Sequence, residues 1–278
     1  MSNLSDLLPA GAGGKQVDFV ASGTLPSGQT VALKTNGQVE AVSGVTQGVG
    51  AESVFEAATV DYNVATYDSN SNKVVIAFRD AGNSYYGTAI VGTVSGTSIS
   101  FGTPVVFETS NTAYISATFD SNSNKIVFAY NDAGNSDYGT AIVGTVSGTS
   151  ISFGTAVIFE SAITLHVSAT FDSTSNKVVI AYVDLGNSSY GTAIAFGSAA
   201  VFESASTNYV SVTYDSTNGK TVVSYQDGGN SDYGTAVVGT VSGTSISFGT
   251  AVVFAAASTY YPSATFDSTN NKTVIAYR

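Results

Sequence analysis

The stretch that decides the fold runs from Val106 to Phe153 and reads VFETSNTAYISATFDSNSNKIVFAYNDAGNSDYGTAIVGTVSGTSISF. Short β-branched and aromatic segments alternate in it with clusters of Asn, Asp, Ser and Gly, which is typical of strands joined by tight turns. We expect four strands, over residues 114–120, 125–130, 139–146 and 149–153. A connector that ends in Val-Phe-Glu precedes them.

Five copies of this pattern follow one another along the 278-residue chain, and we number them the first to fifth repeats. An aspartate at the end of the first strand marks each copy: Asp68, Asp120, Asp172, Asp215 and Asp267. Their spacings of 52, 52, 43 and 52 residues suit propeller blades. The sequence therefore predicts an all-β protein, a five-bladed β-propeller with four antiparallel strands per blade.

Two features of the repeat support this interpretation. The residue before the repeated lysine is Asn in four copies and Gly219 in the other, which predicts a backbone position with positive φ. The second strand, as in Lys177–Tyr182, is apolar at nearly every position. This pattern indicates burial on both faces, as expected of a strand between neighbouring blades.

The two ends of the chain are expected to complete one blade. The fifth repeat stops after its second strand at Arg278, while residues 29–42 have the pattern of third and fourth strands around an Asn36-Gly37 turn. N-terminal strands would then complete the last blade and close the ring, which removes exposed edges. Residues 17–278 would form the propeller and residues 1–16 a flexible tail or attachment arm. An open β-solenoid is the alternative fold.

The third repeat is irregular because it is nine residues shorter than its neighbours between Gly191 and Phe202. The missing residues correspond to the hairpin between the third and fourth strands. We expect a shortened third blade, two or three strands wide, with a notch on the rim. Such a notch is either a tolerated deletion or a docking edge for another subunit.

Charge and composition exclude several classes of function. The formal net charge is −11, and five of the nine basic residues are lysines at one repeated position, so no basic patch is expected. Nucleic acid and anionic membranes are therefore poor partners. The chain has no Cys and no apolar run long enough to span a bilayer. Because residues 1–9 lack the basic flank and the long apolar stretch of a signal peptide, we expect none there.

Alternating strand direction brings the start of every first strand to the same end of the propeller, close to its axis. An aromatic residue stands there in each repeat: Tyr62, Tyr114, His166, Tyr209 and Tyr261. Nearby loops add a repeated aspartate: Asp80, Asp132, Asp184 and Asp227. Such a surface could bind sugars, because aromatic rings stack on apolar sugar faces and carboxylates bind hydroxyls. Packing between blades and ordinary Asp-x-Gly-Asn turn chemistry are the alternatives.

Catalytic chemistry has little support in the sequence. His166 is the sole histidine, and no Ser/His/Asp set, Cys nucleophile or His-rich metal cluster can be composed. Most carboxylates recur once per repeat, which indicates a role in folding. We expect no enzyme activity, no cofactor and no metal, and keep a glycosidase-like enzyme as a remote alternative.

Two segments resemble uncharacterised repeat proteins of tailed bacteriophages, especially phages of marine bacteria. They are residues 17–33, VDFVASGTLPSGQTVAL, and the repeated GNSDYGTAIVGTVSGTSISFG. The resemblance carries no established active or binding residues. It implies a virion component, such as a tail-fibre or appendage protein that contacts other virion proteins and host-surface glycan. A structural or decoration subunit that assembles through its rim or N-terminal arm is the alternative.

Overall fold

The computed structural model describes residues 21, 31–36, 38–41 and 50–278, in two compact parts, Met1–Gly50 and Ala51–Arg278. In the first part, β1 (Val31–Leu33) pairs antiparallel with β2 (Val39–Ala41) as a separate two-stranded sheet. A hairpin is thus present where the sequence predicts one. The expected tail or arm, residues 1–16, lies outside the described residues.

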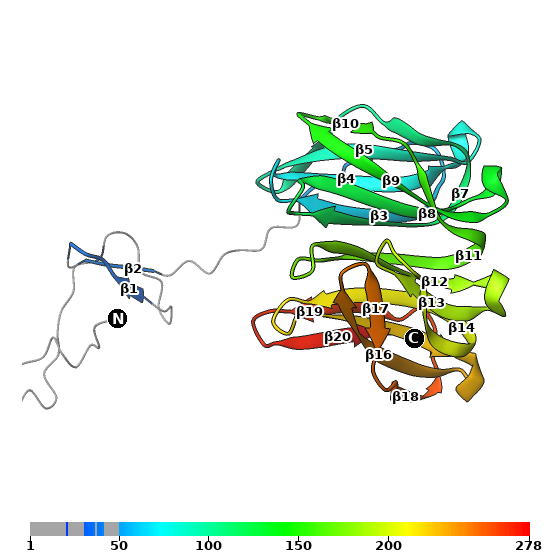
Figure 1. The fold of residues 1–278 in the computed structure, drawn as a ribbon. Coiled ribbons are helices and arrows are strands. Elements are labelled where there is room, and N and C mark those ends of the chain that lie inside the picture. The colour runs from blue at the N-terminus through cyan, green and yellow to red at the C-terminus, as the bar shows by residue number, and fades with distance from the viewer. Residues whose placement is uncertain (1–20, 22–30, 37, 42–49) are drawn as a thin grey trace, which may run out of the picture. The chain divides into compact units, whose positions relative to one another are not determined.

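The second part consists of antiparallel strands that repeat in order along the chain (Figure 1). The first repeat comprises β3 (Val60–Asp68), β4 (Lys73–Asp80), the short 3-10 helix η2 (Ala81–Asn83), β5 (Tyr86–Ser95) and β6 (Ser98–Phe101). The second comprises β7 (Val105–Asp120), β8 (Lys125–Asp132), η3 (Ala133–Asn135), β9 (Tyr138–Ser147) and β10 (Ser150–Phe153). The third comprises β11 (Val157–Asp172), β12 (Lys177–Asp184), η4 (Leu185–Asn187) and β13 (Tyr190–Ile194). The fourth comprises β14 (Ala200–Asp215), β15 (Lys220–Asp227), η5 (Gly228–Asn230), β16 (Tyr233–Ser242) and β17 (Ser245–Phe248), and β18 (Val252–Ser258), β19 (Ser263–Asp267) and β20 (Lys272–Ala276) follow.

The connectors between repeats are themselves strands. β7, β11 and β14 each run for 16 residues. The first half of β7 pairs with β5 of the first repeat, and its second half pairs with β8 of the second. Each long strand is therefore the outer strand of one repeat and the inner strand of the next, so 16 strands join in a single sheet.

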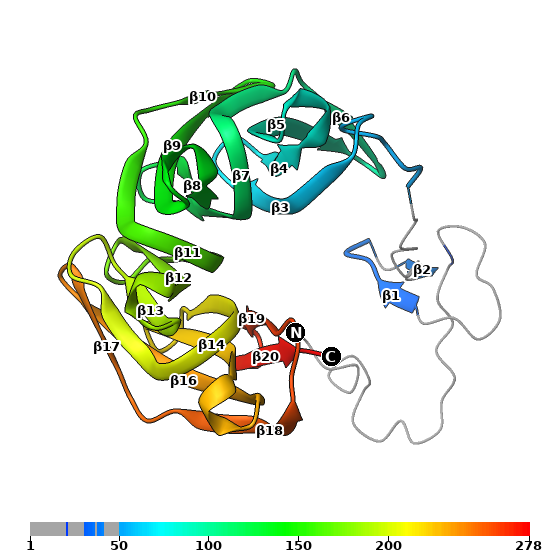
Figure 2. The same ribbon diagram turned by 90° about the vertical axis from the view of Figure 1, so that its right-hand side faces the viewer.

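The repeats follow one another in an arc around a common axis, as in a propeller (Figure 2). The arc is open, which differs from the predicted closure of the ring. β19 and β20 pair only with each other, as a two-stranded sheet apart from the 16-stranded one. The all-β antiparallel architecture is as predicted, whereas five complete blades are not seen, because the fifth repeat has two strands in this part of the chain.

The shortened third repeat agrees with the prediction. β13 has five residues where β5, β9 and β16 have ten, and no hairpin strand pairs beyond it. The missing hairpin leaves the side of the second repeat uncovered. Val143 of β9 is 42% exposed, whereas its counterpart Val91, which faces a repeat with a complete hairpin, is fully buried.

The core lies between successive repeats. The second strands β4, β8, β12 and β15 are buried along most of their length on both faces, as their apolar sequences predict. Phe107, for example, packs against Phe128 and Tyr130 in one inter-repeat cluster. The turn residue before the lysine has positive φ in all five repeats, with Gly219 at +63° and the four Asn residues at +55° to +56°. Both predictions are confirmed.

Candidate functional site

The inner strands of the first four repeats contain a bulge at the position of the repeated aromatic residue. In β7 the pairing with β8 shifts between Ala113 and Ser116, and the same shift recurs at equivalent points of β3, β11 and β14. A bulge leaves the extra residue unpaired and redirects its side chain. Here that residue is the aromatic one, and it points toward the axis.

The five aromatic side chains form a continuous row around one end of the axis. Ring centroids lie 5.1 Å apart for Tyr62–Tyr114, 5.0 Å for Tyr114–His166, 4.9 Å for His166–Tyr209 and 4.5 Å for Tyr209–Tyr261. These spacings fall in the range of favourable tilted and edge-to-face pairs. The structure thus brings together all five residues that the repeat pattern singles out.

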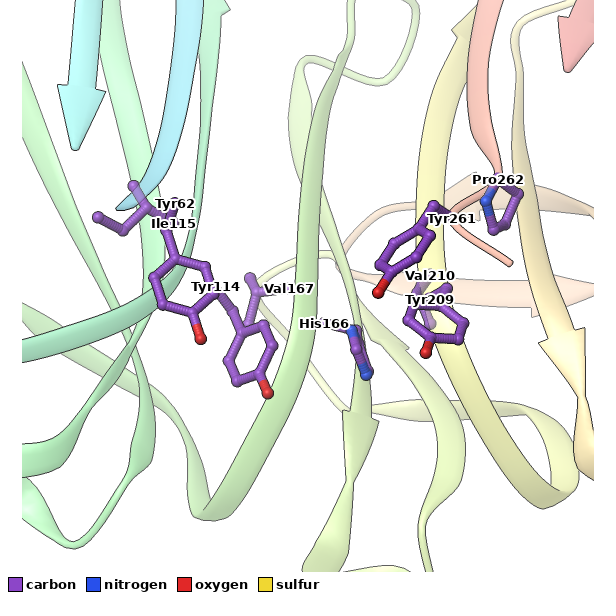
Figure 3. A pocket seen from close by; sticks show the side chains of 9 residues that line it. All are labelled: Tyr62, Tyr114, Ile115, His166, Val167, Tyr209, Val210, Tyr261 and Pro262. Carbon is purple, nitrogen blue, oxygen red and sulfur yellow. The ribbon is translucent and has the colours of Figure 1, made fainter. Parts of the chain in front are cut away.

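The aromatic row lines a cavity of about 530 Å³. Its floor is apolar and comes from the residues that follow the aromatic ones: Ile115, Val167, Val210 and Pro262. Figure 3 shows the tyrosine hydroxyls pointing to the same side, away from this floor. The cavity therefore combines ring faces, a few hydroxyl groups and one imidazole, and its volume suits a small ligand.

The backbone of the aromatic row is strained. Tyr62 has a φ of +49°, and the other four residues have φ of +51°. A left-handed conformation is uncommon for bulky residues and is ordinarily taken by Gly or Asn, as this chain itself does at the turn before the lysine. The same strain recurs in all five repeats although Gly or Asn would relieve it. This indicates that the aromatic side chain itself is needed at that point, and strained residues of this kind cluster at binding sites.

Burial determines the protonation of these groups. Desolvation raises the pKa of the Tyr114 phenol, and the adjacent Tyr62 raises it further. Desolvation likewise raises the pKa of Tyr209, with a smaller contribution from Tyr261. Burial lowers the pKa of His166, because the charged imidazolium loses its hydration. These shifts favour the neutral forms of Tyr114, His166 and Tyr209.

The four repeated aspartates cap turns, in contrast to the aromatic residues, which line the cavity. Each ends a second strand and caps a 3-10 turn, with its Oδ1 accepting backbone N–H groups of the loop. Asp132, for example, accepts from Gly134 at 3.0 Å and is 8% exposed. None of Asp80, Asp132, Asp184 and Asp227 lines the aromatic cavity. The structure thus gives these carboxylates the turn-capping role that the sequence offers as the alternative.

A Glu–Tyr hydrogen bond recurs in the second, third and fourth repeats. The hydroxyl of Tyr130 donates to Glu108 at 3.2 Å, and that of Tyr182 donates to Glu160 at 2.9 Å. Tyr225 and Glu203 form the third such pair, at 3.1 Å. Desolvation, followed by the charge of Asp132, raises the pKa of Glu108. Because the pair recurs in three successive repeats and its tyrosines are fully buried, it belongs to the packing between repeats.

Two arginines border the aromatic row, and sequence reasoning missed them. The Arg79 guanidinium lies 4.8 Å from the centre of the Tyr62 ring and bonds to Asp61 at 2.7 Å. The Arg278 guanidinium lies 5.8 Å from the centre of the Tyr261 ring. A signal was present in the sequence, because these are the only two arginines of the chain and they occupy one repeat position.

The described residues include no group of three or more His, Cys, Asp or Glu side chains that could hold a metal ion. They also include no helix long and apolar enough to cross a membrane. The aromatic cavity contains no carboxylate among its lining residues. Its chemistry is that of stacking and hydrogen bonding.

The fold and the cavity define a propeller-like all-β protein with an aromatic site at one end of its axis. No family model matches the chain, and no curated protein matches it. Among solved structures it is similar to the Hadza microbial sialidase Hz136, with a TM-score of 0.55 and 8% sequence identity. The match covers 78% of this chain and 52% of that one, so this chain spans about half the length of the sialidase. At this identity the likeness concerns the fold.

Proposed function

We propose that this protein is a non-enzymatic binding module that takes a glycan in the aromatic cavity. The observation that carries the proposal is the row of five aromatic residues held at positive φ around a cavity of about 530 Å³. Tyrosine rings stack on the apolar faces of sugars, and their hydroxyls exchange hydrogen bonds with sugar hydroxyls. The fold neighbour named a sialidase agrees with the use of such an architecture on glycans.

A non-enzymatic role is favoured over a glycosidase-like one by the use of the carboxylates. Glycoside hydrolysis needs two carboxyl groups on either side of the scissile bond. The repeated aspartates cap turns, and Glu108, Glu160 and Glu203 accept hydrogen bonds from buried tyrosines. The lining of the aromatic cavity supplies neither member of such a pair.

The experiment that tests glycan binding is a glycan array probed with the purified protein and with a Tyr114→Ala/Tyr209→Ala variant. We expect the protein to bind and the variant to lose binding, because both rings line the cavity from different repeats. A Tyr67→Ala/Tyr214→Ala variant is the matched control, since these tyrosines lie at the far ends of their strands. Binding that survives in the first variant, or no binding by the folded protein, would reject the proposal.

We further propose that the arc is closed in the intact protein as a five-bladed propeller, with residues 29–42 completing the last blade. Val238 of the fourth repeat is 47% exposed, although its counterparts Val91 and Ala195 are fully buried under the hairpin of the following repeat. A hairpin of the predicted type exists at residues 31–41. The test is an engineered disulfide pair between the hairpin and the fourth repeat, whose formation in a monomer would support closure.

The virion location rests on the resemblance of residues 17–33 and of the repeated segment to phage proteins. We propose a tail-fibre or appendage protein, with the glycan site facing the host surface. Labelled antibody against the protein, viewed on intact phage particles by electron microscopy, is expected to mark the tail. Labelling absent from particles would reject this location without affecting glycan binding.

The notch favours a second candidate, a structural or decoration subunit. A cavity of about 270 Å³ opens where the third repeat lacks its hairpin, and it is lined by exposed apolar side chains, including Val143, Val157 and Phe196. Exposed apolar surface of this kind is typical of protein contacts. Under this candidate, removal of residues 1–16 or a Val157→Asp change would abolish particle assembly, whereas the Tyr114→Ala/Tyr209→Ala variant would assemble normally.

A further inference from the structure

The repeats of this chain are nearly identical, and two facing positions beside the aromatic row are among those that differ. The residue before the aromatic one differs in every repeat: Asp61, Ala113, Leu165, Asn208 and Tyr260. The residue facing it on the second strand also varies: Arg79, Asn131, Val183, Gln226 and Arg278. By contrast, the segment Gly-Thr-Ala is the same in all four copies that contain it. Asn131, Val183 and Gln226 are buried, and the amides of Asn131 and Gln226 donate to backbone carbonyls of the next repeat. The arginines occupy the same position in the first and last repeats of the arc, where their side chains lie over aromatic rings.

Both arginines stand at this varied position, in the first and fifth repeats. Arg79 lies over the rings of Tyr62 and Tyr85, at 4.8 and 5.1 Å from their centres. Arg278 lies over those of Tyr260 and Tyr261, at 5.6 and 5.8 Å. Tyr62 and Tyr261 are the two ends of the aromatic row. Arg79 belongs to β4, and Arg278 follows the end of β20. Figure 2 shows these two strands on the two sides of the opening in the arc.

This placement puts a guanidinium group over the ring at each end of the aromatic row, beside the cavity lining, in a strongly acidic chain. The net charge is −11. The repeated lysines are engaged elsewhere, as Lys73 and Lys125 donate to Thr93 and Thr145 at 2.8 Å at the far end of the strands. In Ala51–Arg278, the arginines are the cationic side chains found over rings of the aromatic row.

The two guanidinium groups differ in their remaining hydrogen-bonding capacity. Arg79 donates from Nη2 to Asp61, which offsets its charge, while its buried Nε has no partner. Arg278 is exposed and forms no ion pair with any residue that the structure describes. It also lies close enough to Tyr209 to lower the pKa of that phenol in opposition to burial. Of the two guanidinium groups, Arg278 is thus the one with an unpaired charge among the described residues, at the Tyr261 end of the row.

We infer that the ligand of the aromatic cavity is an acidic glycan, which stacks its sugar faces on Tyr114 and Tyr209 and places a carboxylate at an arginine beside the end of the row, at Arg278 foremost and at Arg79 by the other end. Guanidinium groups bind carboxylates through paired, charge-assisted hydrogen bonds. A neutral sugar would engage the rings and leave Arg278 without an ion-pair partner among the described residues, whereas Arg79 already pairs with Asp61. This inference rests on the proposed function, since it specifies the class of glycan bound.

The test compares carboxylated glycans with carboxyl-reduced forms of the same glycans, on an array and by calorimetry. We expect the carboxylated form to bind at least tenfold more tightly, as expected for a charge-assisted contact. Arg278→Gln should remove that preference while the reduced glycan binds as before. Lys125→Gln, which removes one positive charge at the far end of the strands, should leave the preference unchanged. The preference should also weaken as salt is raised.

The outcomes separate this inference from the function on which it rests. Equal or tighter binding of the reduced glycans, or an unchanged preference in Arg278→Gln, would overturn the acidic class and leave glycan binding intact. Failure of every glycan to bind would overturn both. Because Arg79→Gln leaves Asp61 unpaired, the double variant Arg79→Gln/Asp61→Asn is the second test. Its melting temperature is compared with that of the parent before binding is measured, and loss of part of the preference is expected.

Discussion

The hydroxyl oxygen of Ser211 accepts a hydrogen bond from the backbone N–H of Ala264 at 3.0 Å, across 53 positions of sequence. The same link joins Ser116 to Ala169 and Ser168 to Val212. Each serine lies two residues after the aromatic residue and bonds to the inner strand of the next repeat. These links hold successive inner strands together just behind the aromatic row.

Removing this link should weaken the contact between repeats. We expect Ser211→Ala to lower the free energy of unfolding by about 1 kcal/mol, because it leaves a backbone N–H without its acceptor. Chemical denaturation followed by circular dichroism measures the change. Ser263→Ala is the informative companion, since Ser263 is the counterpart in the fifth repeat. If the ring closes, Ser263 meets the first repeat and its loss costs a similar amount; if the arc stays open, the variant is neutral.

A second prediction concerns the glycines at the outer edge. A Cβ at Gly102 would overlap the carbonyl oxygen of Thr149 in the hairpin of the next repeat, whereas Gly154 meets only the carbonyl of Val143 at 3.7 Å. Gly102→Ala should therefore destabilise the protein by about 2 kcal/mol through overpacking. Gly154→Ala, facing the missing hairpin of the third repeat, should leave the melting temperature nearly unchanged. Equal losses in the two variants would contradict the role given to the deletion.

The single histidine should make stability depend on pH. Burial lowers the pKa of His166 below its usual value of 6.5, so between the two values the unfolded chain binds more protons than the folded one. Stability is fully present above pH 6.5 and falls as the pH drops below it, until the folded pKa is passed. His166→Tyr places there the residue found in the other four repeats. The difference in melting temperature between the two proteins should widen from pH 7.5 to pH 5.5, and a constant difference would argue against this origin.

The capping aspartates should matter for stability and leave binding intact. Asp132→Ala removes the acceptor of the Gly134 N–H and should cost about 1 kcal/mol, as loss of a cap does. Ligand affinity of the folded variant should equal that of the parent protein, because Asp132 does not line the cavity. Thermal melting and binding measured on the same sample separate the two effects. A large loss of ligand affinity in Asp132→Ala would indicate that the repeated aspartates contribute to binding.

Much of the fold could be predicted from the sequence because the signals are local and repeated. Exchange of Asn for Gly before the lysine indicates positive φ, and the apolar run of 178–182 indicates burial on both faces. The connector strands were missed, because Glu108-Thr109-Ser110-Asn111 is polar and its pairing partner is set by the preceding repeat.

The site was predicted only in part. The five aromatic residues were found by their position in the repeat, but nothing in a tyrosine's sequence context reveals that its φ is positive. The aspartates were assigned to the same surface because they lie at the same end of the strands, as the pairing of Thr112 with Asp132 shows. Which way each carboxylate turns depends on the loop N–H groups, and these are fixed only when the 3-10 turn forms.

The 16-residue strands shared by two repeats also bear on how such a chain can grow. The repeat is 52 residues long in most copies. The first half of its long strand pairs with the preceding repeat, and the second half pairs within its own repeat. A single repeat cut out of the chain would lose the pairing of its connector strand with the preceding repeat, so we expect each repeat to depend on its neighbour for stability. Insertion or loss of whole copies leaves every such shared strand intact, while a cut within β7, β11 or β14 damages two neighbours at once.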